Sequence, residues 1–330
     1  MIMRCLDALA ASDYPACEII VVDDCSTDNS AEVSRQRGAA VLKMTHQSGP
    51  AAARNFGSQQ ARGDVLLFVD ADVVVHSNAI RRVAESFENN PGLGAVFGSY
   101  DDEPAEKNFL SQYKNMFHHF VHQQANPEAE TFWAGCGAID RRIFAAVGGF
   151  DGDLYRRPAI EDIELGYRMR RQGHRILLDK DLQCKHLKEW RLGSLLRADV
   201  LSRAVPWTRL ILERNQQVND LNLKTSEKVS AVVAGLLVAA LFASLFSLKF
   251  LFVAAALAPA IVLLNLDFYR FFLRRKGIGF VAGTYFMHVF YYLYSTATFA
   301  LCWLQHQFRQ SVKANPMNSV GDGQNLKGED

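Results

Sequence analysis

Three long apolar runs near the C-terminus constrain the fold of this 330-residue chain most strongly. They cover residues 229–247, 250–266 and 279–304. Each reaches or approaches the roughly 20 residues that a helix needs to span a bilayer. Buried core helices are the alternative, but three such runs in succession favour membrane spans. We therefore expect a transmembrane region at residues 229–304, preceded by a linker at 216–228 and followed by a polar tail at 305–330.

Positive charge between the second and third runs predicts the orientation. We expect a short loop there, which carries Arg270, Arg274, Arg275 and Lys276. Clusters of Lys and Arg mark the cytoplasmic side of a membrane protein. Two crossings separate this cluster from the N-terminal part, so we expect that part to be cytoplasmic, in a multi-pass protein of the plasma membrane. Residues 1–7 carry no secretory signal. The third run is rich in Tyr, and either spans the bilayer or lies at its interface.

Short β-branched runs that end in carboxylates indicate a soluble α/β domain over residues 1–215. The run 18–22 ends at Asp23 and Asp24, and the run 65–69 ends at Asp70 and Asp72. Helical periodicity at 51–61 and 78–88 alternates with these strands, which predicts a mostly parallel sheet flanked by helices. Ligands of such sheets bind outside the carboxyl ends of the strands. Both acidic pairs are therefore expected at one crevice.

The spacing of Asp70 and Asp72 is typical of a metal site. Residues two apart on extended backbone point to the same side. Carboxylate oxygens suit Mg²⁺ or Mn²⁺ as the cofactor. An isolated Asp-x-Asp is more often a turn cap, but the preceding buried strand and the second acidic cluster favour the metal here.

A helix over residues 161–172 begins with three carboxylates, Glu161, Asp162 and Glu164. The helix dipole explains one or two of them. On a helix Asp162 points away from the face that Glu161 and Glu164 share, so it is a candidate general base. His186 follows a predicted strand at 175–178 and is either an ordinary surface or packed residue or a metal ligand.

Other features leave alternatives open. The aromatic and small residues at 132–138 suit either a ligand loop or a tight strand crossing. The Arg- and Trp-containing segment at 190–212 suits either a membrane surface or packing on the sheet. The net charge of +1 gives no signal for nucleic acid as a partner. Six cysteines without a CxxC pair indicate reduced thiols.

Five motifs, taken in order, resemble the inverting family 2 glycosyltransferases of GT-A fold. They are DDCSTD at 23–28, GPAAARNFG at 49–57, DAD at 70–72, GGFD at 148–151 and ED at 161–162. The resemblance covers about residues 4–215. It implies a GT-A-like (Rossmann-like) fold and a hexosyltransferase-type enzyme of cell envelope polysaccharide. Such an enzyme passes a sugar from a nucleotide-sugar donor to a lipid-linked or glycan acceptor, with inversion.

The resemblance also implies roles for individual residues. It assigns Asp23, Asp24, Arg54 and Asp70 to the donor, Asp70, Asp72 and His186 to the metal, Asp162 to catalysis, and Trp133, Gly135 and Glu161 to the acceptor side.

Two departures from the family pattern qualify the expected function. The family's first strand is absent before residue 4, so we expect an N-terminally truncated domain, or a start further upstream. The Q-x-x-R-W signature of processive members is also absent, which favours single transfer over polymer synthesis. The alternatives are a catalytically inactive membrane protein acting in assembly, or a nucleotidyltransferase. The latter would carry a phosphate loop rich in Gly and Lys, which is not seen.

Overall fold

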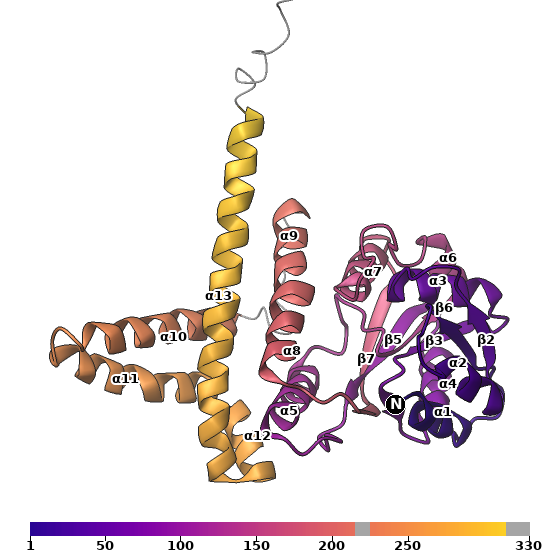
Figure 1. Ribbon diagram of the computed structural model, residues 1–330, viewed down its shortest axis with the longest axis horizontal. Coiled ribbons are helices and arrows are strands. Elements are labelled where there is room, and N and C mark those ends of the chain that lie inside the picture. The colour runs from indigo at the N-terminus through magenta and orange to yellow at the C-terminus, as the bar shows by residue number, and fades with distance from the viewer. Residues whose placement is uncertain (215–224, 315–330) are drawn as a thin grey trace, which may run out of the picture.

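The computed structural model describes residues 1–214 and 225–314, and it places an α/β domain beside a set of C-terminal helices (Figure 1). The strands are β1 (Ile20–Asp23), β2 (Ala40–Lys43), β3 (Val65–Val69), β4 (Val73–Val75), β5 (Leu93–Tyr100), β6 (Cys136–Asp140) and β7 (Arg175–His186). β1 and β2 form a parallel pair. The other five strands form one sheet in the order β3-β6-β5-β7-β4.

This five-stranded sheet is mixed, so the expectation of a mostly parallel sheet is wrong in strand direction. β6 lies antiparallel between β3 and β5, and β4 lies antiparallel to β7. β5 and β7 pair in parallel. After β5 the chain passes through α5 (Phe109–Gln124) and an irregular segment before it returns as β6 in the opposite direction. Alternating strands and helices in the sequence do not reveal this return.

Among the described residues, seven helices belong to the domain. They are α1 (Ile2–Ala10), α2 (Ser30–Gln36), α3 (Pro50–Gln60), α4 (Ala79–Asn89), α5, α6 (Arg141–Ala146) and α7 (Glu161–Arg171). Pro50 suits the first turn of α3, where no backbone N–H is needed. Gly49 before it has φ +88°, and a Cβ there would lie 2.3 Å from the Arg156 carbonyl oxygen. A glycine is therefore required where α3 starts.

The core lies on both faces of the sheet. Every residue of β5 is buried, and its side chains alternate between the faces. Phe97 packs in one apolar cluster with residues of α6 and α7. Val96 packs in the other, with Val83 of α4 and partly buried residues of α1. β5 is thus the centre of the domain, and the strand ends on either side of it carry the acids.

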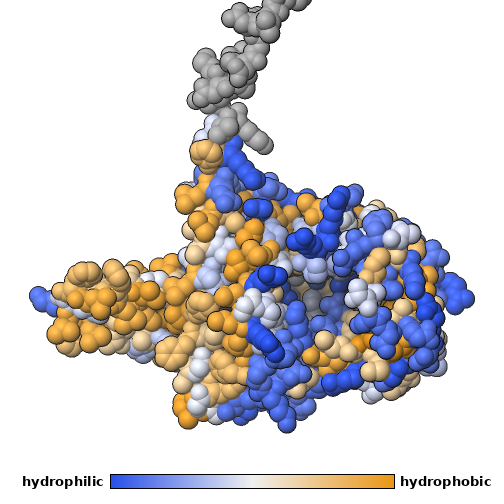
Figure 2. Space-filling view, viewed as in Figure 1, coloured by the Kyte–Doolittle hydropathy of each residue, from blue (hydrophilic) through white to orange (hydrophobic). Residues whose placement is uncertain are grey.

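The C-terminal helices leave a large apolar surface exposed. They are α8 (Leu192–Leu196), the π-helical segment η1 (Arg197–Ala204), α9 (Val205–Arg214), α10 (Thr225–Ala243), α11 (Lys249–Leu264), α12 (Leu266–Lys276) and α13 (Ile278–Ala314). Figure 1 shows the α10–α11 hairpin projecting away from the domain, with α13 running across its base. Figure 2 shows this hairpin covered by apolar side chains, whereas the α/β domain is mainly hydrophilic.

The apolar runs meet the requirements of a membrane span only in part. Among the described residues one helix, α10, is long and apolar enough to cross a bilayer. The pair α11–α12, bent by 78°, would be a second if it forms one span. The expected three spans are therefore not confirmed. Residues 216–224 of the expected linker lie outside the described residues, and residues 225–228 form the start of α10. The last 16 residues of the tail, 315–330, also lie outside the described residues.

The four cations between the runs stand on a helix, α12, and not in a loop as expected. Phe268 and Phe272, on the other face of α12, are buried against Phe117 of α5 and its neighbours. This aromatic packing stabilises helical structure where the charges alone predicted a connection. α12 therefore joins the hairpin to the domain.

A buried ion pair joins the domain to the C-terminal helices. Lys114 of α5 donates to both carboxylate oxygens of Asp199 in η1, at 2.5 and 2.8 Å. The Tyr294 hydroxyl of α13 donates to the same carboxylate at 2.7 Å. In α9, Trp207 donates to the Tyr167 hydroxyl at 3.0 Å and Leu210 lies in the domain core. These contacts favour packing on the domain for the segment at 190–212.

Candidate functional site

Asp70 lies where β3 ends, beside the segment that leads into β6. The β3–β6 register pairs Val69 with Cys136, and the Asp70 N–H donates to the Gly135 carbonyl at 3.2 Å. The Asp70 carboxylate accepts from Arg54 Nη2 at 2.7 Å. Burial raises the pKa of Asp70, and the Arg54 charge opposes that rise. The side chains of Asp70 and Asp72 remain partly exposed, so a ligand can reach both.

Strand register also brings His186 to Asp72. His186 is the last residue of β7, not a residue of a following loop, and it pairs with Val73 of β4. Its Nε2 lies 3.4 Å from Asp72 Oδ2. On its other side, Nδ1 lies 2.9 Å from Asn115 Oδ1, and the ring stacks on Tyr100 at 4.5 Å. With Nδ1 donating to Asn115, Nε2 presents its lone pair towards Asp72.

The pair of Asp72 and His186 fits a divalent metal ion. A carboxylate oxygen and an imidazole lone pair this close repel each other unless a proton or a cation lies between them. A proton on Nε2 can take the place of that cation, and the hydrogen bond that it makes to Asp72 lowers the pKa of this carboxyl, although burial opposes its ionisation. Across residues 1–214 and 225–314, no three His, Cys, Asp or Glu side chains are placed to hold a metal alone. Mg²⁺ often takes one or two carboxylates and completes its shell with phosphate and water.

Arg54 connects the metal side of the site to α7. Its Nη1 donates to Glu161 Oε1 at 2.9 Å, and Glu161 Oε2 accepts from the Ala159 N–H at 2.9 Å. Glu161 is buried. Both of its oxygens thus hold Arg54 and the start of α7, and the acceptor-side role of Glu161 stays a prediction.

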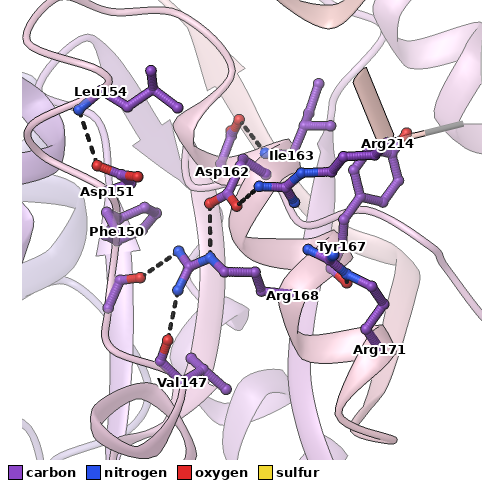
Figure 3. A network of polar contacts seen from close by, with 12 residues as sticks. Val147, Phe150, Asp151, Leu154, Asp162, Ile163, Tyr167, Arg168, Arg171 and Arg214 are labelled. Carbon is purple, nitrogen blue, oxygen red and sulfur yellow. Dashed lines mark hydrogen bonds and ion pairs between the residues drawn. The ribbon is translucent and has the colours of Figure 1, made fainter. Parts of the chain in front are cut away.

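Asp162 points to the segment before β6. Its Oδ2 accepts from the Ala134 N–H at 3.1 Å, and Oδ1 accepts from the Ile163 N–H at 2.8 Å, the bond drawn beside Asp162 in Figure 3. Burial and the neighbouring Glu161 charge raise the pKa of Asp162 to about 6. A carboxyl group that titrates near neutral pH is suited to accept a proton from a substrate hydroxyl.

Trp133 and Gly135 form one wall next to these acids. The Trp133 ring lies edge-on to Tyr100 with centroids 4.9 Å apart. A Cβ on Gly135 would lie 2.4 Å from the Trp133 indole. The absence of a side chain at Gly135 therefore allows the Trp133 indole to pack directly on the backbone of residue 135. The sequence left 132–138 as either a strand crossing or a ligand loop. The structure has strand β6 from Cys136, and the segment before it contacts Asp162 through the Ala134 N–H.

Asp23 and Asp24 lie at the end of β1 and act on neighbouring backbone. Asp24 accepts from the Ser48 and Gly49 N–H groups at 2.7 and 2.8 Å, which fixes the start of α3. Asp23 accepts from the Ser26 N–H at 2.8 Å, and hydrogen bonding to Ser26 lowers its pKa. Within the described residues no hydrogen bond or ion pair joins Asp23 or Asp24 to Asp70 or Asp162. Their contact with a donor stays a prediction.

Two side chains, those of Asn55 and Arg168, hold the 148–151 motif in place. Asn55 of α3 donates to the Phe150 carbonyl at 2.7 Å and accepts from the Phe150 N–H at 2.9 Å. Arg168 of α7 donates to the Val147 and Gly149 carbonyls, each at 2.6 Å, as Figure 3 shows for Val147. The motifs at 49–57 and 148–151 are therefore one structural unit.

Some of the residues that support the site carry no recognisable signal in the sequence. Asn115 and Tyr100 orient His186, and neither stands in a motif. Arg168 also donates to Glu164 at 2.8 Å, and the spacing of four between them was a usable helical signal. Asn115 offered no such signal, because its partner lies 71 positions away.

Comparison with known proteins identifies a similar family and similar relatives. Residues 1–148 match the family model "Glycosyl transferase family 2". The chain is 27% identical over 208 residues to the poly-beta-1,6-N-acetyl-D-glucosamine synthase of Staphylococcus aureus, over 59% of this chain and 48% of that protein. The Staphylococcus epidermidis synthase is 34% identical over 98 residues, covering 28% and 24%. The chain spans about half the length of the curated relatives it matches.

Among solved structures, the fold resembles a mannosyltransferase from Pyrobaculum calidifontis, determined in complex with GDP-Man and Mn²⁺. The TM-score is 0.55 at 17% identity, over 91% of this chain and 83% of that one. The mixed sheet, the acids at its strand ends and the matched family model lead to one conclusion. Residues 1–148 match a glycosyl transferase family 2 domain, and the fold of the chain is the GT-A fold.

Proposed function

We propose that this chain transfers a sugar from a nucleotide-diphosphate sugar to an acceptor hydroxyl, with inversion. The observation that carries the proposal is the meeting of four segments distant in sequence. Asp70 bonds to Arg54 and to Gly135, Arg54 bonds to Glu161, and the adjacent Asp162 bonds to Ala134. The family 2 domain supports the same reaction class.

In this proposal Asp162 is the catalytic base. Its carboxylate takes the proton of the acceptor hydroxyl while that oxygen bonds to the anomeric carbon and the bond to the donor diphosphate breaks. A single displacement inverts the configuration. With a pKa of about 6, Asp162 is mainly ionised at neutral pH. Base catalysis of this kind contributes about 10²–10⁴-fold to the rate.

Asp72 and His186 would hold Mg²⁺ or Mn²⁺ from the protein side. When bound, such an ion neutralises negative charge on a departing diphosphate. Support comes from the facing donor atoms of the two side chains, 3.4 Å apart. The solved mannosyltransferase of similar fold was determined with Mn²⁺ and GDP-Man. Arg54 keeps the Asp70 carboxylate beside this position, with Asp23 and Asp24 assigned to the nucleotide.

The acceptor proposed is a glycan or a lipid-linked sugar, with the catalytic domain on the cytoplasmic side of the plasma membrane. The exposed apolar hairpin and the apolar length of α10 support attachment to a bilayer. The cations of α12 favour the cytoplasmic side. The staphylococcal relatives are named for making a polysaccharide.

The test is release of nucleoside diphosphate from a panel of nucleotide sugars by membranes that contain the full chain. Asp162→Asn should lower release by about 10²–10⁴-fold while donor binding in calorimetry is retained. Asp64→Asn is the matched control, because this side chain is 91% exposed, and it should change nothing. Full turnover by Asp162→Asn would remove the assigned base. Products longer by more than one sugar would indicate polymer synthesis, and no release from any donor would favour the inactive alternative.

A second variant tests the metal side. Asp72→Ala removes the carboxylate that faces His186 and should abolish the Mn²⁺-dependent part of donor binding. Calorimetry with and without Mn²⁺ measures this directly. Equal Mn²⁺-dependent binding by the variant and the original chain would contradict the assignment.

A further inference from the structure

A cavity of about 620 Å³ lies between α5 and α12, and none of the candidate catalytic residues lines it. Its walls include Arg270, Arg274, Arg275 and Asp267 of α12, and His119 and Phe120 of α5. The Phe271 ring of α12 stacks on the His119 ring with centroids 5.7 Å apart, which holds the two helices together. The cavity is therefore a fixed feature of the junction between the domain and the C-terminal helices.

The charge of this cavity is positive. Three guanidinium groups and one carboxylate line it. Arg270 lies 3.9 Å from Asp267, and Arg275 lies 2.5 Å from Asp102, which is outside the lining. Arg274 has no hydrogen-bond or ion-pair partner within the described part of the chain.

Arg270 and Arg274 are four residues apart on one helix. Like charges at this spacing face the same side and destabilise the helix unless an anion lies between them. Phosphate oxygens match the fork of guanidinium donors well. The arrangement is therefore suited to a phosphate-bearing ligand.

The surroundings distinguish a lipid phosphate from a free one. The chain bends by 78° between α11 and α12, so α12 turns away from the hairpin at its base. Directly before α12 the hairpin exposes Leu263 and Leu264, and Figure 2 shows a continuous apolar surface over the hairpin. A ligand with a phosphate in the cavity and acyl chains along the hairpin would satisfy both surfaces at once. A free phosphate would satisfy only the arginines.

We propose that this cavity binds the headgroup phosphate of an anionic phospholipid, with Arg270 and Arg274 as its ligands. Basic pockets beside membrane helices on the cytoplasmic side bind such headgroups. The inference rests on the membrane attachment contained in the proposed function, but it does not depend on sugar transfer. Lipid binding at this cavity would hold the domain at one depth relative to the bilayer through α12.

The experiment titrates the purified full chain in detergent with dioctanoyl phosphatidylglycerol, dioctanoyl phosphatidylcholine and inorganic phosphate, and follows binding by calorimetry. Phosphatidylglycerol should bind more tightly than the other two. The double variant Arg270→Gln/Arg274→Gln should weaken that binding by about 25-fold, since each arginine near an anionic lipid contributes about fivefold. The matched control Arg62→Gln/Arg142→Gln removes two charges from side chains that are each 86% exposed, and should bind as the original does.

Three outcomes would overturn the assignment: equal affinity for the two lipids, unchanged affinity of the double variant, or displacement of phosphatidylglycerol by inorganic phosphate at equal concentration. Nucleoside diphosphate release is measured on the same samples. Lipid binding without release would count against sugar transfer alone. Release without selective lipid binding would count against this cavity alone.

Discussion

The α/β domain and the α10–α11 hairpin differ in the exposure of their phenylalanine side chains. Phe97 in β5 is 1% exposed, whereas Phe252 in α11 is 80% exposed. The domain buries its aromatic side chains between sheet and helices and shows polar groups to its surroundings. The hairpin shows its apolar side chains and packs little behind them. Water explains the first arrangement, and an apolar medium or partner is needed to explain the second.

The largest effect is expected in the domain core. Phe97→Ala should lower the free energy of unfolding by about 3–5 kcal/mol, because it leaves a cavity at the centre of the sheet. Denaturation of the detergent-solubilised chain, followed by tryptophan fluorescence, measures this. Phe252→Ala is the matched control and should stay within about 0.5 kcal/mol. Equal losses for the two variants would remove the contrast between the regions.

A charged substitution on the hairpin tests whether α10 lies in a lipid bilayer or faces water. Leu236 of α10 is 53% exposed, and Leu236→Lys should disfavour insertion by about 3 kcal/mol if α10 lies in a bilayer. The fraction of chain that resists alkaline extraction from membranes reports the change. Leu154 is a comparably exposed leucine of the domain, at 62%, and Leu154→Lys should leave that fraction unchanged. Tolerance of lysine at both positions would mean that the hairpin faces water or a polar partner.

A smaller effect is expected from pH, which should change the transfer rate of the domain but not the membrane association of the hairpin. The raised pKa of Asp162, about 6, means that the reactive carboxylate form is present above that pH and is lost below it. Glu161 and Arg54 are the charged groups that act on it, in opposite directions. The transfer rate at saturating donor should therefore fall about tenfold for each pH unit below 6. Membrane association should stay constant over the same range, and a rate that is flat between pH 5 and 7 would contradict the role of Asp162.

Local elements were predictable because their signals are local. β3 matches the predicted strand at 65–69, and α7 begins at Glu161 as its acidic first turn indicated. Residues 93–131, which hold β5 and α5, received no prediction. β5 contains Gly98, where a Cβ would lie 2.0 Å from the Leu182 carbonyl oxygen of β7. The glycine that allows the two strands to approach also weakens the strand signal in the sequence.

The acids of the site were predictable, and their arrangement was not. Asp70, Asp72 and Asp162 were singled out from strand ends and a helix start. Whether His186 reaches Asp72 depends on the pairing of β4 with β7, which joins residues more than a hundred positions apart. The engagement of Glu161 with Arg54 likewise depends on tertiary packing.

Lys114 and Asn115 are consecutive residues of α5. Lys114 forms an ion pair with Asp199, which also accepts a hydrogen bond from Tyr294 of the long helix α13. Asn115 bonds to His186 and orients it. No hinge lies between these two contacts, so a tilt of α13 would be transmitted to the imidazole through less than one helical turn. The position of the His186 imidazole beside Asp72 is therefore coupled to the orientation of the long C-terminal helix.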